Sequence, residues 1–284
     1  MISIIICSRK QSDFDALAAN VAQTVGVPFD LIRIDNSTNT YSICQAYNIG
    51  AAQSTFNHLC FVHEDVKFIT ENWGIILANL LKEQTIGLVG VAGGKYKSKH
   101  IGLAYNATSS NMLRLNILQH GNGNVRHDYI NPDNLSQEEV VSIDGVFMAC
   151  RKEVWEQNKF DEHTQKGFHF YDMDFSLQIG RTKKVLVTYD ILLEHFSMGN
   201  LDKRWYDQAT IAHRKWHSFL PRSTAKLSPQ ELDELEYENA SFLFFFLVEN
   251  KFPKRQKLWQ LIILLKLRPF KKYNLNLLLL GLKS

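Results

Sequence analysis

The sequence predicts an α/β fold with a mixed, mostly parallel β-sheet flanked by helices, followed by a helical C-terminal extension. Short apolar runs alternate with amphipathic helical segments through roughly the first ninety residues. The apolar runs are continuous, which is typical of strands covered on both faces. After about residue 200 the chain becomes helical and increasingly apolar and basic. Alternating strands and helices favour a parallel sheet, because crossover connections place helices on its faces.

The bulk composition is that of a globular protein with a sizeable core. The chain has 284 residues, of which 45% are hydrophobic and 21% are charged, and its formal net charge is +3. This length suits one main domain with an appendage, which we place at residues 1–215 and 216–284. The net charge is too small to indicate nucleic-acid binding, so we expect no nucleic-acid partner.

The cysteines and the N-terminal segment favour a cytoplasmic protein. The four cysteines show no paired spacing, and Cys7, Cys60 and Cys150 lie in apolar runs that read as strands. Buried free thiols of this kind fit a reducing compartment. The first residues lack the positive charge and the apolar length of a signal peptide. No run reaches the roughly 20 apolar residues that span a bilayer.

The elements follow in a regular order with one long interruption. The expected strands are 2–7, 29–35, 58–62, 86–92, 140–150 and, as the last, 184–189. The expected helices are 12–25, 43–52, 73–81, 152–157 and 172–180. Ser12 and Asp15 resemble a capping box, and Gly26 is a natural stop. Residues 93–139 have no sustained period and are expected to form a long, partly ordered loop with a functional role.

The C-terminal extension reads as helices with two open interpretations. Ser228, Pro229 and Glu231 predict a capped helix start, and a second helix is expected over 259–267. The end of the chain, 275–282, is nearly all leucine. In the first, the apolar stripes cover the sheet or form a homodimer contact. In the second, the stripes and the neighbouring Lys and Arg residues together bind the inner face of an anionic membrane.

Polar residues gather where the expected strands end, the edge at which open parallel sheets bind ligands. They are Ser8 and Arg9 after the first strand, Asp35 after the second, His63, Glu64 and Asp65 after the third, and Asp144 near the fifth. No glycine-rich phosphate loop is present. Phosphate groups bound here would instead need a divalent cation held by carboxylates.

Five stretches of this chain, in order, resemble the family 2 glycosyltransferases of the GT-A fold over roughly residues 1–200. They are 2–8, 34–37 with 46–50, 61–66, 143–149, and 160–162 with 170–175. The resemblance implies a nucleotide-sugar donor and a divalent metal, Mn²⁺ or Mg²⁺, as cofactor. It is strong evidence for the family and weak evidence for the substrate.

The resemblance also implies a role for each polar residue. Asp35 would bind the nucleoside, with Ser8 and Arg9 near the base or ribose. Asp65 would hold the metal that bridges the donor diphosphate, with His63 beside it and His195 completing the site. From its place at the strand end, Glu64 is a further candidate for donor binding. Asp144 would contact the donor or the acceptor, although it fits equally well as a cap for the turn at Gly145. Asp172 would be the general base, with Asp174 as the alternative.

Two residues depart from the family pattern. His63 stands where an aspartate usually begins the metal motif, and imidazole suits Mn²⁺ better than Mg²⁺. Tyr171 stands where an acidic residue often precedes the base. A third feature, His213 and His217 at helical spacing, lacks a further ligand, so we interpret these histidines as packing or surface residues.

The sequence therefore predicts an inverting glycosyltransferase. It would move a sugar from UDP to a hydroxyl of a glycan or lipid-linked acceptor in bacterial surface polysaccharide synthesis. A nucleotidyltransferase would need a glycine-rich basic loop after the first strand, and residues 7–12 contain no glycine. An inactive relative that binds a sugar nucleotide or glycan stays open because of His63 and Tyr171.

Overall fold

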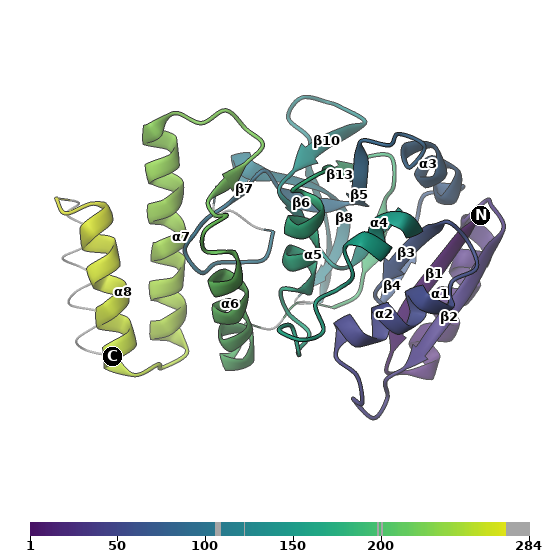
Figure 1. The fold of residues 1–284 in the computed structure, drawn as a ribbon, viewed down its shortest axis with the longest axis horizontal. Helices are drawn as coiled ribbons and strands as arrows, with labels where there is room; N and C mark the ends of the chain where they lie inside the picture. Colours follow the sequence, from purple (N-terminus) through teal and green to yellow (C-terminus); the bar gives the residue numbers. More distant parts are fainter. Residues whose placement is uncertain (106–108, 122, 198, 200, 271–284) are drawn as a thin grey trace.

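The protein has the predicted α/β architecture, built on a mixed sheet of seven strands (Figure 1). The computed structural model describes residues 1–270 except 106–108, 122, 198 and 200. The strand order is β10 (Gln137–Val140), β13 (Lys184–Thr188), β5 (Ile86–Gly90), β12 (Phe147–Arg151), β3 (His58–Val62), β1 (Ile2–Ser8) and β2 (Phe29–Asp35). Strands β1, β2, β3, β5 and β13 run in one direction, while β12 and β10 run antiparallel to their neighbours. The sheet is therefore mixed and mostly parallel, as predicted.

Helices cover both faces of this sheet, which explains the continuous apolar runs of its strands. Helices α1 (Gln11–Thr24) and α3 (Trp73–Leu80) lie on one face, and α2 (Ile43–Gln53), α4 (Lys152–Gln157) and α5 (Tyr171–Ile179) on the other. Along β1, Ile4 and Ile6 pack in the first of these cores and Ile5 in the second. Successive side chains of a strand point to opposite faces, so a strand buried on both sides is apolar throughout.

Residues 93–139 form strands, and the expectation of a long loop was wrong. A second sheet contains β11 (Ser142–Ile143), β6 (Ala92–Gly94), β8 (Leu113–Gly121), β14 (Leu193–His195) and β4 (Val66–Phe68), with β9 (Asn124–Ile130) paired to β8. The short elements β7 (Tyr96–Lys97) and η1 (Ser110–Met112) also fall in this stretch. On β8 the polar residues Arg114 and Asn116 are buried together with Leu115 and Ile117. Their burial hides the alternation by which a strand is recognised.

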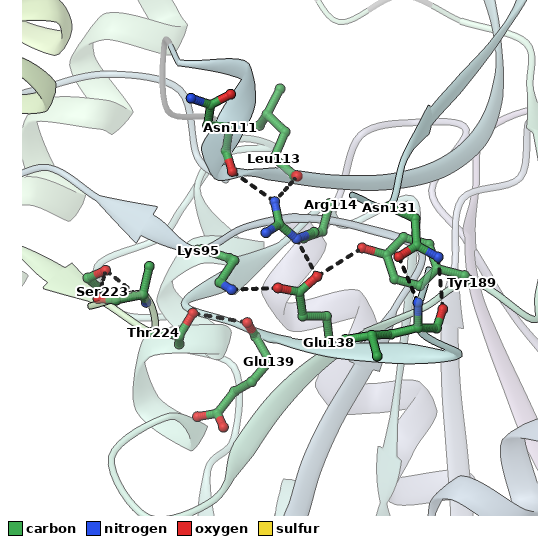
Figure 2. Close-up of polar contacts among 12 residues, drawn as sticks. Lys95, Asn111, Leu113, Arg114, Asn131, Glu138, Glu139, Tyr189, Ser223 and Thr224 are labelled. Atoms are coloured by element: carbon green, nitrogen blue, oxygen red, sulfur yellow. Dashed lines mark hydrogen bonds and ion pairs between the residues drawn. The ribbon is translucent and has the colours of Figure 1, made fainter. Parts of the chain in front are cut away.

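A buried charged network fastens this second sheet to the first (Figure 2). Glu138 of β10 pairs with Arg114 of β8 and with Lys95, and it accepts a hydrogen bond from the Tyr189 hydroxyl at 3.4 Å. Arg114 Nη1 also donates to the carbonyl oxygens of Asn111 and Leu113. Burial alone would raise the pKa of Glu138, but the hydrogen bonds and charges of Arg114 and Lys95 lower it. The carboxylate is thus held ionised between two cations.

Three helices make the C-terminal layer, at the far end of the molecule from β1 and β2 (Figure 1). They are α6 (Lys203–Trp216), α7 (Pro229–Glu249) and α8 (Lys254–Leu267). The predicted capping box at the start of α7 is present, with Ser228 and Glu231 each bonding the other's backbone. Helix α8 begins at Lys254, earlier than expected, and Pro253 is its N-cap residue. Among the residues described, no helix is long and apolar enough to cross a membrane.

Three other local predictions were wrong. Helix α1 begins at Gln11 with Lys10 as its N-cap and no side-chain cap, so Ser12 does not cap it. The expected strand 140–150 is broken into the end of β10, β11 and β12, because the chain bends at residue 141 and turns at residues 145–146. Strand β13 is followed by β14 and by β15 (Arg222–Ser223), which pairs with β7.

The remaining expectations concern the cysteines, the two histidines of helical spacing and the leucine-rich end of the chain. All four cysteines are free, and Cys60 and Cys150 are buried as predicted, whereas Cys7 is half-buried. His213 is a packing residue whose Nδ1 bonds the Ala209 carbonyl, and His217 is exposed. The leucine-rich segment 275–282 lies outside the described residues.

Candidate metal and catalytic site

Strand pairing brings His63, Asp65 and His195 together at the carboxyl end of β3. Residues 63–65 form the turn between β3 and β4, and β4 pairs with β14 so that Val66 lies opposite His195. The Phe196 amide donates to the Asp65 carbonyl oxygen at 3.0 Å, which extends this pairing past the strand end. The three side chains that the sequence singled out as metal ligands are therefore neighbours in space.

These three side chains form a cluster with the geometry of a metal site. One donor atom from each lies within 4.8 Å of the others. His195 Nε2 is 3.7 Å from Asp65 Oδ1, and the two imidazole rings are 5.8 Å apart between centroids. Two imidazole nitrogens and one carboxylate suit Mn²⁺ better than Mg²⁺, which prefers oxygen ligands alone.

The electrostatics of the cluster favour the protonation states that a cation requires. Burial and the nearby His195 lower the pKa of His63, so its imidazole is neutral. Burial would raise the pKa of Asp65, but the Ser197 hydroxyl and the neighbouring His63 and His195 outweigh it and lower that pKa. Metal ligands must be deprotonated, and the two lowered pKa values favour that state for His63 and Asp65.

Each of the two histidines is oriented by a hydrogen bond at one of its ring nitrogens. His195 Nδ1 lies 3.0 Å from Gln119 Oε1, so Nδ1 donates in this contact and Nε2 is the nitrogen that faces Asp65. His63 Nε2 lies 2.7 Å from the Tyr171 hydroxyl. Partners of this kind fix the tautomer and ring orientation of metal-binding histidines. Tyr171 thus occupies the position of the family's acidic residue with a definite contact of its own.

Gly145 makes room for Tyr171 beside His63. A Cβ atom at position 145 would lie 2.0 Å from the Tyr171 hydroxyl oxygen, closer than any real contact. The glycine is required here by the close approach of a side chain, because its backbone needs no positive φ. A small residue in the turn before β12 therefore allows the contact between Tyr171 and His63.

Asp172 lies at the first turn of α5, next to Tyr171 in the chain. The residue before this helix, Phe170, has φ of +65°, an uncommon left-handed conformation for a bulky residue. The Gly145 amide donates to Asp172 Oδ2 at 3.2 Å. Burial and the charge of Asp144 raise the pKa of Asp172 to about 7. A carboxyl group with a pKa near the working pH is suited to proton transfer.

The other two acidic candidates near the base have structural contacts. Asp174 is 1% exposed and accepts hydrogen bonds from Trp216 Nε1 at 2.8 Å and from Gln178, and it pairs with Lys215 at 2.6 Å. Asp144 Oδ1 accepts from the Val146 amide at 2.8 Å, so it caps the turn between β11 and β12. The fully engaged Asp174 favours Asp172 as the base.

The residues predicted to bind the nucleoside lie at the ends of β1 and β2. Asp35 is exposed and accepts a hydrogen bond from the Ser37 amide at 3.0 Å. Ser8 is buried, and its hydroxyl accepts from Arg33 Nε at 3.1 Å. The Arg9 side chain is exposed. Direct contact of these residues with a donor stays a prediction.

Glu64 holds the loop between β1 and α1. Its Oε2 accepts hydrogen bonds from the backbone amides of Arg9 at 2.9 Å and Lys10 at 3.1 Å. The carboxylate that follows His63 therefore ties the two loops at this sheet edge together. Direct contact of Glu64 with a donor stays a prediction.

Sequence reasoning missed two residues near the site, one on β8 of the second sheet and one on β7, which pairs with β15 outside that sheet. Gln119 of β8 orients His195, and it also donates to the Ser197 carbonyl at 2.6 Å. Lys97 of β7 is 1% exposed. Burial lowers its pKa to about 7, although the charge of Asp172 acts in the opposite direction and raises it. Both lie in 93–139, where the apolar residues of 113–118 were the available signal.

Comparison with known proteins agrees with this geometry. Residues 3–216 match a family described as "Glycosyltransferase like family". The chain belongs to this glycosyltransferase-like family. The expected enzyme class, a glycosyltransferase, is thereby confirmed at the level of the family, whose match contains His63, Asp65, Asp172 and His195.

The likeness to one solved structure confirms the expected GT-A fold of this family member. The chain is similar to the crystal structure of GalNAc-T7 with UDP, GalNAc and Mn²⁺, with a TM-score of 0.51 and 13% identity. That alignment covers 88% of this chain and 54% of the other, so the chain spans about half the length of that structure. A crystal structure of A197 from STIV matches with a TM-score of 0.39 and 14% identity, covering 69% of this chain and 86% of that one. No curated protein matches the sequence.

Proposed function

We propose that this glycosyltransferase-like chain transfers a sugar from UDP to an acceptor hydroxyl with inversion at the anomeric carbon. The observation that carries the proposal is the cluster of His63, Asp65 and His195 beside Asp172. Tyr171 links the two parts, because its hydroxyl contacts His63 and it precedes Asp172 in the chain. A cation site and a base at one sheet edge are what transfer from a nucleoside diphosphate requires.

The cluster would hold a divalent cation, preferably Mn²⁺. Such a cation supplies positive charge that stabilises the leaving diphosphate, so that no acid need protonate it. Asp65 would contribute the negative charge of the site, and His63 and His195 would each contribute an imidazole nitrogen. Gln119 and Tyr171 keep the two imidazoles in the orientation that this role requires.

Asp172 would act on the acceptor. Its carboxylate takes the proton of the acceptor hydroxyl while that oxygen attacks the anomeric carbon and the bond to the diphosphate breaks. One base and one direct displacement give inversion, with the proton on Asp172 and the negative charge on UDP. The Gly145 amide orients the carboxylate through its bond to Oδ2.

The donor and acceptor classes have unequal support. The UDP and Mn²⁺ bound in the GalNAc-T7 structure support UDP as the nucleotide for a chain of the same fold. Asp35, with Ser8 and Arg9 at the neighbouring strand end, would face the nucleoside. The acceptor, a glycan or lipid-linked hydroxyl in surface polysaccharide synthesis, rests on the family resemblance.

Calorimetric titration of UDP, with and without Mn²⁺, tests the metal site. We expect Mn²⁺-dependent binding to the wild type, and loss of that dependence in Asp65→Ala. Asp133→Ala is the matched control, because Asp133 is an exposed carboxylate outside the site. Metal-independent binding that is equal in the wild type and Asp65→Ala would remove Asp65 from the site. Binding without turnover of any UDP-sugar would favour the alternative, an inactive relative that binds sugar nucleotides.

A further inference from the structure

The outer face of α8 carries a stripe of exposed apolar side chains. Trp259 is 64% exposed, Ile262 43%, and Leu258 and Leu265 39% each. These four residues, called the α8 stripe below, recur at helical spacing and so share one side of the helix. The opposite side of α8 is buried against α7 through Leu261 and Leu264. Within the described part of the chain, helix α8 thus carries apolar side chains both on the side that packs against α7 and on the exposed side.

Positive charge is concentrated in the same part of the chain. Residues 250–284 contain nine Lys and Arg residues and no Asp or Glu, which leaves 23 basic and 29 acidic residues in 1–249. The small net charge of +3 therefore conceals an acidic body and a strongly basic end. Lys251, Lys254, Arg255 and Lys266 are exposed at the ends of α8, around the stripe. Helix α8 also forms one end of the molecule (Figure 1).

We propose that the α8 stripe is a docking surface for an anionic phospholipid bilayer. An exposed apolar face rimmed by Lys and Arg is the pattern of helices that lie in the membrane interface. Trp residues favour that interface, because the ring is apolar and the indole N–H is polar. The basic residues would add attraction to anionic headgroups, and their long apolar stems would reach along the bilayer surface.

The charge distribution argues against a second copy of the chain as the occupant. A two-fold interface brings the same patch of both subunits together. Two copies of α8 would then set Arg255 and Lys266 against the same residues of the other copy, with no acidic residue in 250–284 to compensate. Anionic lipid headgroups supply the opposite charge that a second α8 lacks.

Cosedimentation with large unilamellar vesicles tests the proposal on the full-length protein without donor or acceptor. The vesicles are pure phosphatidylcholine, or phosphatidylcholine with about 30% phosphatidylglycerol, a content chosen to give the negative surface potential that basic residues sense. The wild type should bind the anionic vesicles, bind the neutral ones weakly and dissociate as salt is raised. This readout is independent of the proposed transfer activity, so failure of one does not entail failure of the other.

Two pairs of variants separate the apolar and the charged contributions. Trp259→Ser with Ile262→Ser should raise the lipid concentration for half-binding about tenfold or more. Its control is Ile75→Ser with Val125→Ser, which are 44% and 51% exposed and lie on α3 and β9. Arg255→Glu with Lys266→Glu should remove the preference for anionic vesicles. Arg181→Glu with Lys184→Glu changes the net charge equally at exposed residues elsewhere.

All substituted side chains are exposed, so thermal unfolding by circular dichroism should be unchanged. Absence of wild-type binding to anionic vesicles overturns the proposal, as does equal loss of binding in the α8 variants and their controls. A wild-type dimer in light scattering that Trp259→Ser with Ile262→Ser converts to a monomer, without vesicle binding, assigns the stripe to a second copy instead.

Discussion

Asp172 is a carboxyl group whose surroundings oppose its ionisation. Burial and the charge of Asp144 raise its pKa to about 7, so below that pH it is protonated and cannot accept a proton. We therefore predict that kcat/KM for transfer rises with pH by up to about tenfold per unit below 7 and levels off above it. The measurement is a pH-rate profile from 5.5 to 9 at saturating Mn²⁺. A profile that is flat across pH 7 would contradict the role of this carboxyl group.

Replacement of Asp172 should separate catalysis from stability. Asp172→Asn keeps the shape and an acceptor for the Gly145 amide but removes the base, so kcat should fall about a thousandfold, within the range for a lost general base. Because the native pKa is raised, ionisation destabilises the fold as pH climbs from about 4 to about 7, and Asn removes this cost. Thermal unfolding at pH 8 should therefore occur at a higher temperature in the variant.

Asp174→Asn is the matched control, since it weakens the buried contacts to Lys215 and Trp216 and should lower the unfolding temperature. The reverse pattern, with transfer lost in Asp174→Asn and kept in Asp172→Asn, would make Asp174 the base.

The polar residues at the strand ends could be predicted from the sequence because parallel strands deliver their last residues to one edge. His63, Asp65 and His195 meet there as expected. Their partners Gln119 and Tyr171 could not be assigned, because a hydrogen bond between distant segments leaves no periodic signal. Glu64 illustrates the same limit, because its contacts with the backbone amides of Arg9 and Lys10 left no signal in the sequence.

At the scale of elements, the largest discrepancy is the second sheet. Strand β8 buries Arg114 and Asn116, which a period-based reading assigns to solvent. Burial is tolerated because Arg114 meets Glu138, and Asn116 donates to the carbonyls of Tyr189 and Ile191. Buried polar groups are stable when they are paired, and these partners come from elements distant in the chain. The strands of the first sheet that form mainly apolar runs, such as β3 and β5, were predictable.

Glu138 gives a stability prediction for the same sheet. Glu138→Ala would leave Arg114, which is 5% exposed, buried without its carboxylate partner. Loss of one member of a buried ion pair typically costs about 3 kcal/mol or more, so the free energy of unfolding should fall by about that amount. Urea denaturation followed by fluorescence measures it. The adjacent Glu139→Ala, at an exposed position, should change the free energy by less than about 0.5 kcal/mol. If the two variants changed the free energy of unfolding equally, the network of Figure 2 would not contribute to stability.

For the whole molecule, the α/β class and the C-terminal helical layer followed from the sequence, because their patterns are local. The division into residues 1–215 and 216–284 is a different matter, since it depends on which surfaces pack together. Helix α5 of the catalytic part shares one apolar core with α6 and α7, through residues such as Met173, Trp205 and Leu243. We infer that the extension unfolds together with the part that holds Asp172.

The aromatic residue Phe246 tests this coupling. It is 4% exposed and packs against Trp205 with ring centroids 4.7 Å apart and against Phe252 at 5.7 Å. Phe246→Ala should lower the free energy of unfolding by about 4 kcal/mol, the usual cost of removing a buried phenyl group. If the core is shared, urea unfolding stays a single transition at which tryptophan fluorescence, helical circular dichroism and Mn²⁺-dependent UDP binding are lost together. Phe270→Ala, at a residue 96% exposed, should leave all three unchanged. Loss of helical signal before loss of UDP binding would instead mean that α7 and α8 form a unit that unfolds separately from the nucleotide-binding part.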